Sequence, residues 1–154
     1  MADDSGRRVV ASNRKARHEY EVLDTVEAGL VLKGPEVKSV RDGKVAFQDA
    51  FARIDRGEAW LHSFHISPYE QANRFNPDPV RPRKLLLNRD EIRRLAAKVD
   101  EKGLTLVPLD IYFRRGVAKM TIAVARGRKL HDKREKLKKQ TQDREAQRAI
   151  QRAR

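Results

Sequence analysis

The sequence contains no cysteine, which excludes disulfides, thiol nucleophiles and cysteine-ligated zinc or iron–sulfur sites. Aromatic residues make up only 6% of the chain, which argues against a stacking platform for single-stranded nucleic acid. No apolar run reaches the roughly 18 residues needed to span a membrane, and no apolar core of a secretory signal follows the acidic N-terminus. These absences predict a cytoplasmic protein with no membrane partner.

Motifs for catalysis or metal binding are also scarce. The segment Gly29–Gly34 has the glycine spacing of a phosphate-binding loop, but Pro35 and Glu36 stand where that loop needs a lysine and a hydroxyl residue. On a strand, His62 and His65 would point to opposite faces, which is poor geometry for one metal ion. No Gly-x-Ser-x-Gly elbow is present. The sequence therefore predicts no metal or other cofactor, and no enzyme.

Positive charge is abundant. Lysine and arginine number 35 against 22 acidic residues, which gives a net charge of +13 and an isoelectric point near 10.4. Residues 126–154 carry 12 of these basic residues and 4 acidic ones, a net charge of +8. More than half of the excess charge thus lies in under a fifth of the chain. A polyanion is the first partner to expect.

Residues 126–154 are expected to form a tail outside the folded domain. The large apolar side chains there are Leu130, Leu137 and Ile150, too few to offset the entropy of ordering a packed segment. Helix formers are common, and no glycine or proline follows Gly127. We expect this tail to be disordered alone and helical when an anionic partner neutralises it. A basic tail that only keeps the protein soluble is the alternative.

Residues 13–125 are expected to form the folded domain, mainly from strands. Hydrophobic alternation predicts about six of them: two within residues 20–32, separated by a turn at Ala28-Gly29, and one each at residues 47–54, 59–66, 104–113 and 117–125. The last four form two hairpins, turning at residues 55–57 and 114–116. In the last strand one face is apolar, at residues 118, 120, 122 and 124, and the other meets solvent or a ligand.

Two helices and a long loop interrupt the strands. Pro35 suits the first turn of a helix that stops at Asp42-Gly43. Asn88, with a glutamate three residues later, predicts the N-cap of a second helix that ends at Lys102-Gly103. Residues 65–84 hold four of the six prolines and predict a long loop. Antiparallel strands with inserted helices favour a small OB-fold-like β-barrel; a split sandwich is the alternative.

Basic residues cluster at the edges of these elements. Arg14 and Lys15 precede the first predicted strand, Arg83 and Lys84 follow the long loop, and Lys119 lies on the outward face of the last strand. Such groups contact phosphate without reading sequence, and the low aromatic content favours RNA recognised by its shape. Scattered surface charge, a general RNA chaperone and an enzyme acting on RNA are the alternatives.

Six segments resemble a known family. They are residues 13–20, 34–39, 65–69, 83–88, 102–109 and 131–134. Together and in this order they resemble the bacterial SsrA-binding proteins (the small protein B, or SmpB, family), which bind transfer-messenger RNA (tmRNA, or SsrA) in trans-translation. The resemblance runs from about residue 12 to the end. Several matching segments in the same order along the chain are more specific evidence for a family than any single short motif.

The resemblance implies an RNA-binding adaptor. Such a protein, a monomer without a cofactor, grips the tRNA-like domain of tmRNA and is delivered with elongation factor Tu to stalled ribosomes. The residues that match tmRNA-contacting positions of the family are Glu36, Leu87, Asn88 and Lys119. Chemically, a carboxylate or an amide can read a base edge and a lysine can meet phosphate. The alternatives are purely structural roles. Glu36 would complement the dipole at the start of its helix, Asn88 would cap the helix that follows it, and Leu87 would belong to the hydrophobic core.

The resemblance also assigns the tail. It implies that the tail folds as a helix in the empty messenger channel of the 30S subunit within the 70S ribosome, against 16S rRNA. The positions matching the decoding-centre motif are Gly127, Lys129, His131, Asp132, Lys133 and Arg134. His131 could stack on a base while Lys133 and Arg134 contact phosphate. Residues 1–12 match nothing and are expected to be a disordered extension.

Overall fold

The computed structural model describes residues 7–127, without the side chains of Asn73, Glu101 and Lys102. The strands are β1 (Arg7–Ser12), β2 (Tyr20–Leu30), β3 (Val45–Ala46), β4 (Phe51–Asp55), β5 (Glu58–His62), β6 (His65–Ile66), β7 (Arg83–Leu86), β8 (Thr105–Arg114) and β9 (Val117–Gly127). The helices are α1 (Arg14–Glu19), α2 (Gly34–Arg41), the 3₁₀ helix η2 (Glu70–Phe75) and α3 (Arg89–Lys102). The expected tail lies outside the described residues from residue 128 on.

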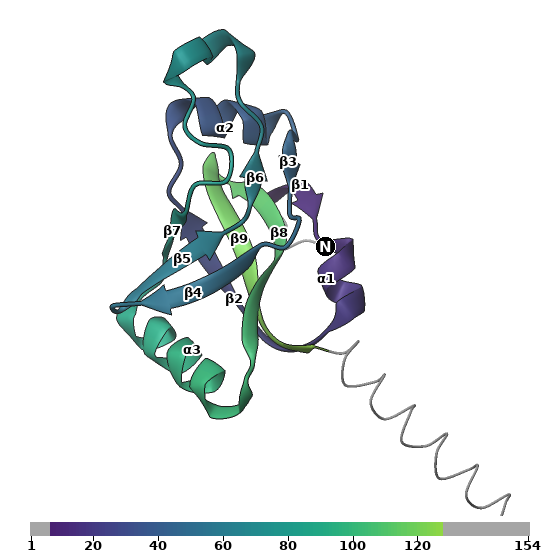
Figure 1. Ribbon diagram of the computed structural model, residues 1–154, viewed down its shortest axis with the longest axis vertical. Helices are drawn as coiled ribbons and strands as arrows, with labels where there is room; N and C mark the ends of the chain where they lie inside the picture. Colours follow the sequence, from purple (N-terminus) through teal and green to yellow (C-terminus); the bar gives the residue numbers. More distant parts are fainter. Residues whose placement is uncertain (1–6, 128–154) are drawn as a thin grey trace, which may run out of the picture.

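The strands close into an antiparallel barrel. Within residues 7–127 the larger sheet has the order β1-β8-β4-β5-β7-β2-β9, and β9 also pairs with β8. This second pairing closes a ring that runs from β8 through β4, β5, β7, β2 and β9 back to β8 (Figure 1). The predicted mainly β, barrel-like fold is therefore confirmed over the split sandwich. The short strands β3 and β6 pair separately.

The ring has a weak seam. In the described barrel, β4 and β8 are joined at the single register pair Ala52↔Leu106, whereas β2 and β9 are in register from Tyr20↔Gly127 to Gly29↔Lys119. Among the described joints of the ring, this one has the fewest register pairs, and the joint of β2 with β7 has two.

The hydrophobic core fills the barrel, and the apolar face predicted for the last strand belongs to it. Ala118, Met120, Ile122 and Val124 are all buried in it. The opposite face of β9 was expected to meet solvent or a ligand, and this is wrong for its second half. There Ala123 and Ala125 pack with Ala16, Val107 and Leu109 in a second, smaller cluster. The cause is α1, which lies against the side of the barrel (Figure 1).

The two remaining α-helices cover the ends of the barrel, α2 at one end and α3 at the other (Figure 1). Both begin and end as predicted. Pro35 lies in the first turn of α2, which ends before Asp42. The Asn88 side chain accepts a hydrogen bond from the backbone N–H of Glu91 at 2.9 Å, and Gly103 takes the left-handed conformation that ends α3.

Two expectations fail in the first thirty residues. Ala28-Gly29 is not a turn, because β2 is one continuous strand with neighbours on both sides. Residues 7–12 are not disordered: they form β1, which pairs with β8 and packs Val10 and Ala11 against the core. Both errors arise because distant strands supply the hydrogen bonds. The basic stretch from Arg14 precedes a predicted strand, as expected, and it forms α1 directly before β2.

Later boundaries also shift. The predicted hairpin at 47–66 exists, but β4 begins only at Phe51 and β5 ends at His62, while residues 45–46 and 65–66 pair with each other as β3 and β6. The expected loop at 65–84 contains β6 and η2 and ends at β7. The hairpin of β8 and β9 is present as predicted.

Candidate nucleic-acid interface

The predicted contact residue Lys119 lies on β9, and two others, Leu87 and Asn88, directly follow the nearby strand β7. Gly29 in β2 is in register with Lys119 of β9 on one side and with Leu86 of β7 on the other. Leu87 and Asn88 follow Leu86 directly. Residues far apart in the sequence thus meet along one row across the barrel wall, since cross-strand partners share a face.

Gly29 lets this row pack closely. A Cβ atom at Gly29 would lie 3.2 Å from the Cβ of Leu86, tighter than ordinary packing allows. The Leu86 side chain therefore lies over a position that has no side chain, and it stays 55% exposed. Leu87 is half-buried and packs against the core, while Asn88 is exposed. The row presents an apolar patch beside the Lys119 ammonium group.

Glu27, which the sequence analysis did not select, organises the charges beside this row. Its carboxylate accepts a hydrogen bond from the Tyr112 hydroxyl and forms ion pairs with Arg114 at 3.1 Å and Lys119 at 3.8 Å. Burial and this carboxylate together raise the pKa of Tyr112 to about 12. The lysine and the arginine keep about a third of their side chains exposed. Glu27 thus holds two exposed cations in place.

Glu36 lies elsewhere and is buried. Its side chain is 2% exposed, and its carboxylate accepts hydrogen bonds from the guanidinium groups of Arg81, at 2.5 and 3.0 Å, and Arg83, at 2.7 Å, and from the backbone N–H of Lys33. Both oxygens are therefore occupied within the protein. In this structure Glu36 presents no acceptor to a base, and it does complement the first turn of α2.

The pKa of Glu36 shows which force dominates. Burial alone would raise it, but the hydrogen bonds from Arg81, the backbone of Lys33 and Arg83 outweigh burial and lower it from the ordinary 4.5. The carboxylate is therefore charged at neutral pH and forms a true ion pair with both arginines.

Arg83 is the buried half of this pair. None of its side chain is exposed, and besides Glu36 it donates to the backbone carbonyls of Phe64 at 2.6 Å and Pro79 at 3.0 Å. Burial lowers the pKa of this guanidinium, against the opposing effect of Glu36. Arg83 was predicted to contact RNA phosphate, and the structure instead places it where it ties the long loop to the barrel. The neighbouring Lys84 is 43% exposed and remains available.

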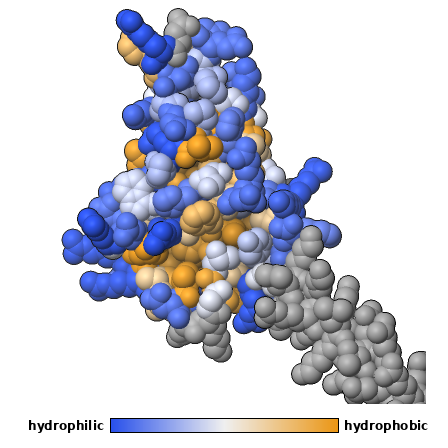
Figure 2. Space-filling model, viewed as in Figure 1, coloured by the Kyte–Doolittle hydropathy of each residue, from blue (hydrophilic) through white to orange (hydrophobic). Residues whose placement is uncertain are grey.

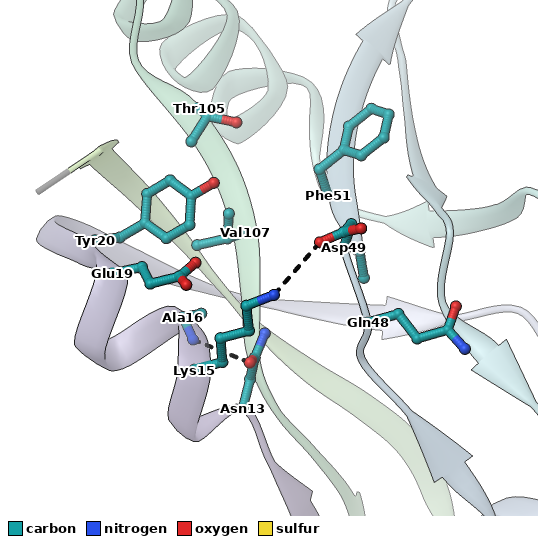
Figure 3. A pocket seen from close by; sticks show the side chains of 11 residues that line it. Asn13, Lys15, Ala16, Glu19, Tyr20, Gln48, Asp49, Phe51, Thr105 and Val107 are labelled. Atoms are coloured by element: carbon teal, nitrogen blue, oxygen red, sulfur yellow. Dashed lines mark hydrogen bonds and ion pairs between the residues drawn. The ribbon is translucent and has the colours of Figure 1, made fainter. Parts of the chain in front are cut away.

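A second basic surface surrounds α1. Arg14 and Lys15 are exposed there, as predicted, and Arg17 forms an ion pair with the buried Asp110 at 2.9 Å. Beside α1 lies a hollow of about 240 Å³ (Figure 3). Since α1 precedes β2 and Gly29 stands near the end of that strand, the two basic surfaces are separated by roughly 25–30 Å of strand.

Hydrophobic surface is concentrated in one area. Figure 2 shows a mostly hydrophilic face with hydrophobic residues gathered over its lower half, where β4 and α3 lie in Figure 1. A groove of about 360 Å³ runs there, lined among others by Ile54, Val99 and Leu104.

Two further findings concern the described residues alone. Nowhere in residues 7–127 do three or more His, Asp or Glu side chains gather so that they could hold a metal ion. No helix of that region combines the length and the apolar character needed to cross a membrane. Of the predicted tail motif, Gly127 ends β9 in register with Tyr20. The other members, Lys129, His131, Asp132, Lys133 and Arg134, lie outside the described residues.

Comparison with known proteins identifies the family. The family model described as "SmpB protein" matches residues 10–152. The chain belongs to the SmpB family. The match takes in most of the barrel and nearly all of the basic segment after it, so the similarity to the SmpB family is not confined to the barrel.

Individual SmpB relatives agree with this. The chain is 58% identical over 142 residues to the SsrA-binding protein of Desulforudis audaxviator, covering 92% of this chain and 93% of that protein. It is 53% identical over 154 residues to the SsrA-binding protein of Synechococcus elongatus, covering 99% and 100%. A solved structure described as "tmRNA-SmpB: a journey to the center of the bacterial ribosome" contains a chain 57% identical, with a TM-score of 0.66, covering 76% of this chain and 82% of that one.

Proposed function

We propose that this protein is the tmRNA-binding adaptor of trans-translation: it binds the tRNA-like domain of tmRNA and brings it to stalled ribosomes. The observation that carries the proposal is the match to SsrA-binding proteins over almost the entire chain. The surface chemistry supports it, because exposed lysines beside an apolar patch suit phosphate and ribose contacts.

The tmRNA site in this proposal is the row across β9, β2 and β7. Lys119 and Lys84 would contact phosphates, Leu87 and the exposed Leu86 would pack against sugar or base, and the Asn88 amide would reach a base edge. Glu27 would act by orienting Lys119, with which it is paired at 3.8 Å. Glu36 and Arg83 would act indirectly, by holding the long loop beside this row.

The adaptor role needs a second RNA site, and we assign it to the basic segment. Residues 126–154, with their net charge of +8, would enter the empty messenger channel of the 30S subunit as a helix. There Gly127, Lys129, His131, Asp132, Lys133 and Arg134 would lie at the decoding centre against 16S rRNA. Elongation factor Tu would accompany the monomeric protein and tmRNA to the 70S ribosome in the cytoplasm, and no catalytic step or cofactor is needed from this chain.

Lys119→Gln tests the tmRNA site. It should weaken binding to the tRNA-like domain of tmRNA by about 1.5–3 kcal/mol, the scale of a hydrogen bond to a charged group, in a filter-binding or anisotropy assay. Lys98→Gln is the matched control, because Lys98 is also about one-third exposed and paired with a carboxylate, Asp24 at 2.8 Å, but lies about 15 Å along α3 from Asn88. Equal loss in both variants would contradict the assignment.

Deletion of residues 130–154 tests the adaptor role. The shortened protein should keep its preference for tmRNA over tRNA at raised salt, where non-specific attraction fades, yet fail to support tagging on stalled ribosomes. Tagging at the full rate would refute the role given to the tail. Loss of any tmRNA preference by the full-length chain at raised salt would instead favour a general RNA chaperone.

A further inference from the structure

The hollow beside α1 has a mixed polar and aromatic lining that the proposed tmRNA site leaves unused. Lys15 comes from α1, Tyr20 from the start of β2, Asp49 from the segment that leads into β4 and Phe51 from the first position of β4 (Figure 3). Its floor includes Val107, which is buried beneath α1. The volume of about 240 Å³ is below the roughly 300–1,000 Å³ of pockets for drug-sized ligands. It suits one small planar group.

Phe51 supplies an aromatic wall. Its side chain is 37% exposed, which is unusual for a ring this large. One side of the ring stacks on His62 of β5, with centroids 5.2 Å apart and planes inclined by 15°. Phe51 stands in β4, between β5 and β8, and it also lines the hollow. A planar ring entering there would continue the stack.

Lys15 and Asp49 place a donor and an acceptor side by side at the hollow. The ammonium nitrogen and a carboxylate oxygen are 3.7 Å apart, and the side chains are 62% and 93% exposed. Such an exposed pair contributes little to stability, so a ligand can replace it at small cost. Gln48, the residue before Asp49, has a positive φ of 48°. A non-glycine residue in this conformation is strained, and such strain is often found at functional sites.

We propose that this hollow binds one unstacked guanine base of an RNA partner. The base would lie against Phe51, the Asp49 carboxylate would accept hydrogen bonds from N1–H and the N2 amino group, and Lys15 would donate one to O6. A carboxylate can accept two parallel bonds, and guanine alone among the four bases offers two adjacent donors next to an acceptor on this edge. The exposed Arg14 nearby would meet the phosphate.

The position of the hollow favours RNA as its ligand. Tyr20, in its wall, is the register partner of Gly127, so the basic segment from residue 128 begins beside it. RNA bound at the very start of that segment would lie close to the hollow. The inference therefore rests on the proposed function for its RNA partner, while the base preference follows from the hollow's own side chains.

Short oligonucleotides test the base preference. Full-length protein would be titrated, at salt high enough to weaken the tail, with uridine heptamers carrying one central guanosine or one central adenosine. We expect about tenfold tighter binding of the guanosine heptamer. Asp49→Asn should abolish this preference. Asp55→Asn is the control, because it removes the same charge from an exposed site at the far end of β4 and should keep the preference.

Phe51→Leu tests the stacking wall. It should weaken binding of both heptamers by about fivefold or more, the scale of one lost aromatic stack, and leave the guanosine-to-adenosine ratio in place. Circular dichroism of each variant would show whether the barrel is folded. Equal affinity of the unaltered protein for both heptamers would overturn the proposal, as would an Asp55→Asn variant that loses the preference as fully as Asp49→Asn.

The two proposals fail in different ways. A protein that prefers tmRNA over tRNA but shows no guanosine preference would refute the guanine site and leave the adaptor role intact. A protein that prefers guanosine, and loses this with Asp49→Asn, but does not prefer tmRNA would refute the adaptor role and keep the guanine site.

Discussion

Glu36 and Arg83 show how much a charged residue's surroundings decide its role. Both were expected to touch RNA, yet their side chains are 2% and 0% exposed and bind each other at 2.7 Å. A buried charge is tolerated only when it is paired and hydrogen-bonded. Arg83 meets this condition through one carboxylate and two backbone carbonyls. The pair therefore ties α2, β7 and the long loop together.

Arg83→Met should destabilise the fold severely. It leaves the Glu36 carboxylate buried with one partner fewer, and breaking a buried pair on one side costs about 3–5 kcal/mol. Urea unfolding monitored by circular dichroism would measure the loss. Lys84→Met is the control and should change stability by less than about 1 kcal/mol, because the Lys84–Glu58 pair is half exposed at 3.7 Å. A similar change in both variants would contradict the role assigned to the buried pair.

Glu36 should also shape the acid stability. Because its folded pKa lies below the ordinary 4.5, its ionised form stabilises the fold at pH values above about 4.5. That contribution is lost as the pH falls from 4.5 through the folded pKa. Glu36→Gln should therefore be less stable at pH 7 and show a flatter decline below pH 4.5, measured as urea midpoints at a series of pH values. An unchanged acid slope would contradict this, with Glu58→Gln as the exposed control.

Residue roles could be predicted only in part. The outward position of Lys119 followed from alternation in its strand, and the exposure of Arg14 and Lys15 from local charge. The burial of Arg83 did not, because only the folded loop brings Glu36 next to it. The role of Glu27 could not be predicted for the same reason: its partners Tyr112, Arg114 and Lys119 come from other strands.

Among the elements, α3 was the most predictable because its signals are local. Asn88 and Glu91 form a reciprocal cap, with each side chain bound to the other's backbone N–H. Gly103 ends the helix. By contrast, the continuity of β2 depends on β7 and β9, and β1 exists because β8 offers it an edge. Sequence patterns within one segment carry no information about such distant partners.

Substitutions at Asn88 can separate its capping role from RNA contact. Asn88→Ala should destabilise the protein by about 1 kcal/mol through loss of the cap. Asn88→Asp keeps an acceptor for the Glu91 N–H and should stay within about 0.5 kcal/mol of the original, while it removes the amide donor and adds negative charge. Urea unfolding checks the first effect. Affinity for the tRNA-like domain of tmRNA checks the second, and full affinity of Asn88→Asp would contradict a base contact through the amide.

At the scale of the molecule, charge and fold are divided. The core belongs to the barrel, and the larger share of the net charge belongs to residues 126–154. The fold class could be predicted because strand alternation and two hairpins limited the choices. The closure of the ring could not, since besides the two hairpins it needs β4 to pair with β8, β7 to pair with β5 and β2, and β2 to pair with β9.

A chain ending at residue 129 should be as stable as the full chain, and its affinity for RNA should depend less on salt. Its urea midpoint should match that of the full chain within about 0.5 kcal/mol, the usual range for changes away from the core. The dependence of RNA affinity on salt should become shallower, because fewer cations displace counterions from the RNA. A large fall in the urea midpoint would show that the removed residues pack on the barrel.

The seam between β4 and β8 gives the barrel a preferred place to open. One register pair, Ala52↔Leu106, closes the ring there, so local unfolding should begin at this joint and cost less than opening β2 from β9. Backbone amides of β4 should then exchange with deuterium sooner than those in the middle of β9. The hollow and the apolar groove are both lined by Phe51 and Thr105, the residues next to Ala52 and Leu106. A base bound in the hollow would therefore stabilise the closed barrel. Its binding should slow the deuterium exchange of the backbone amides in β4.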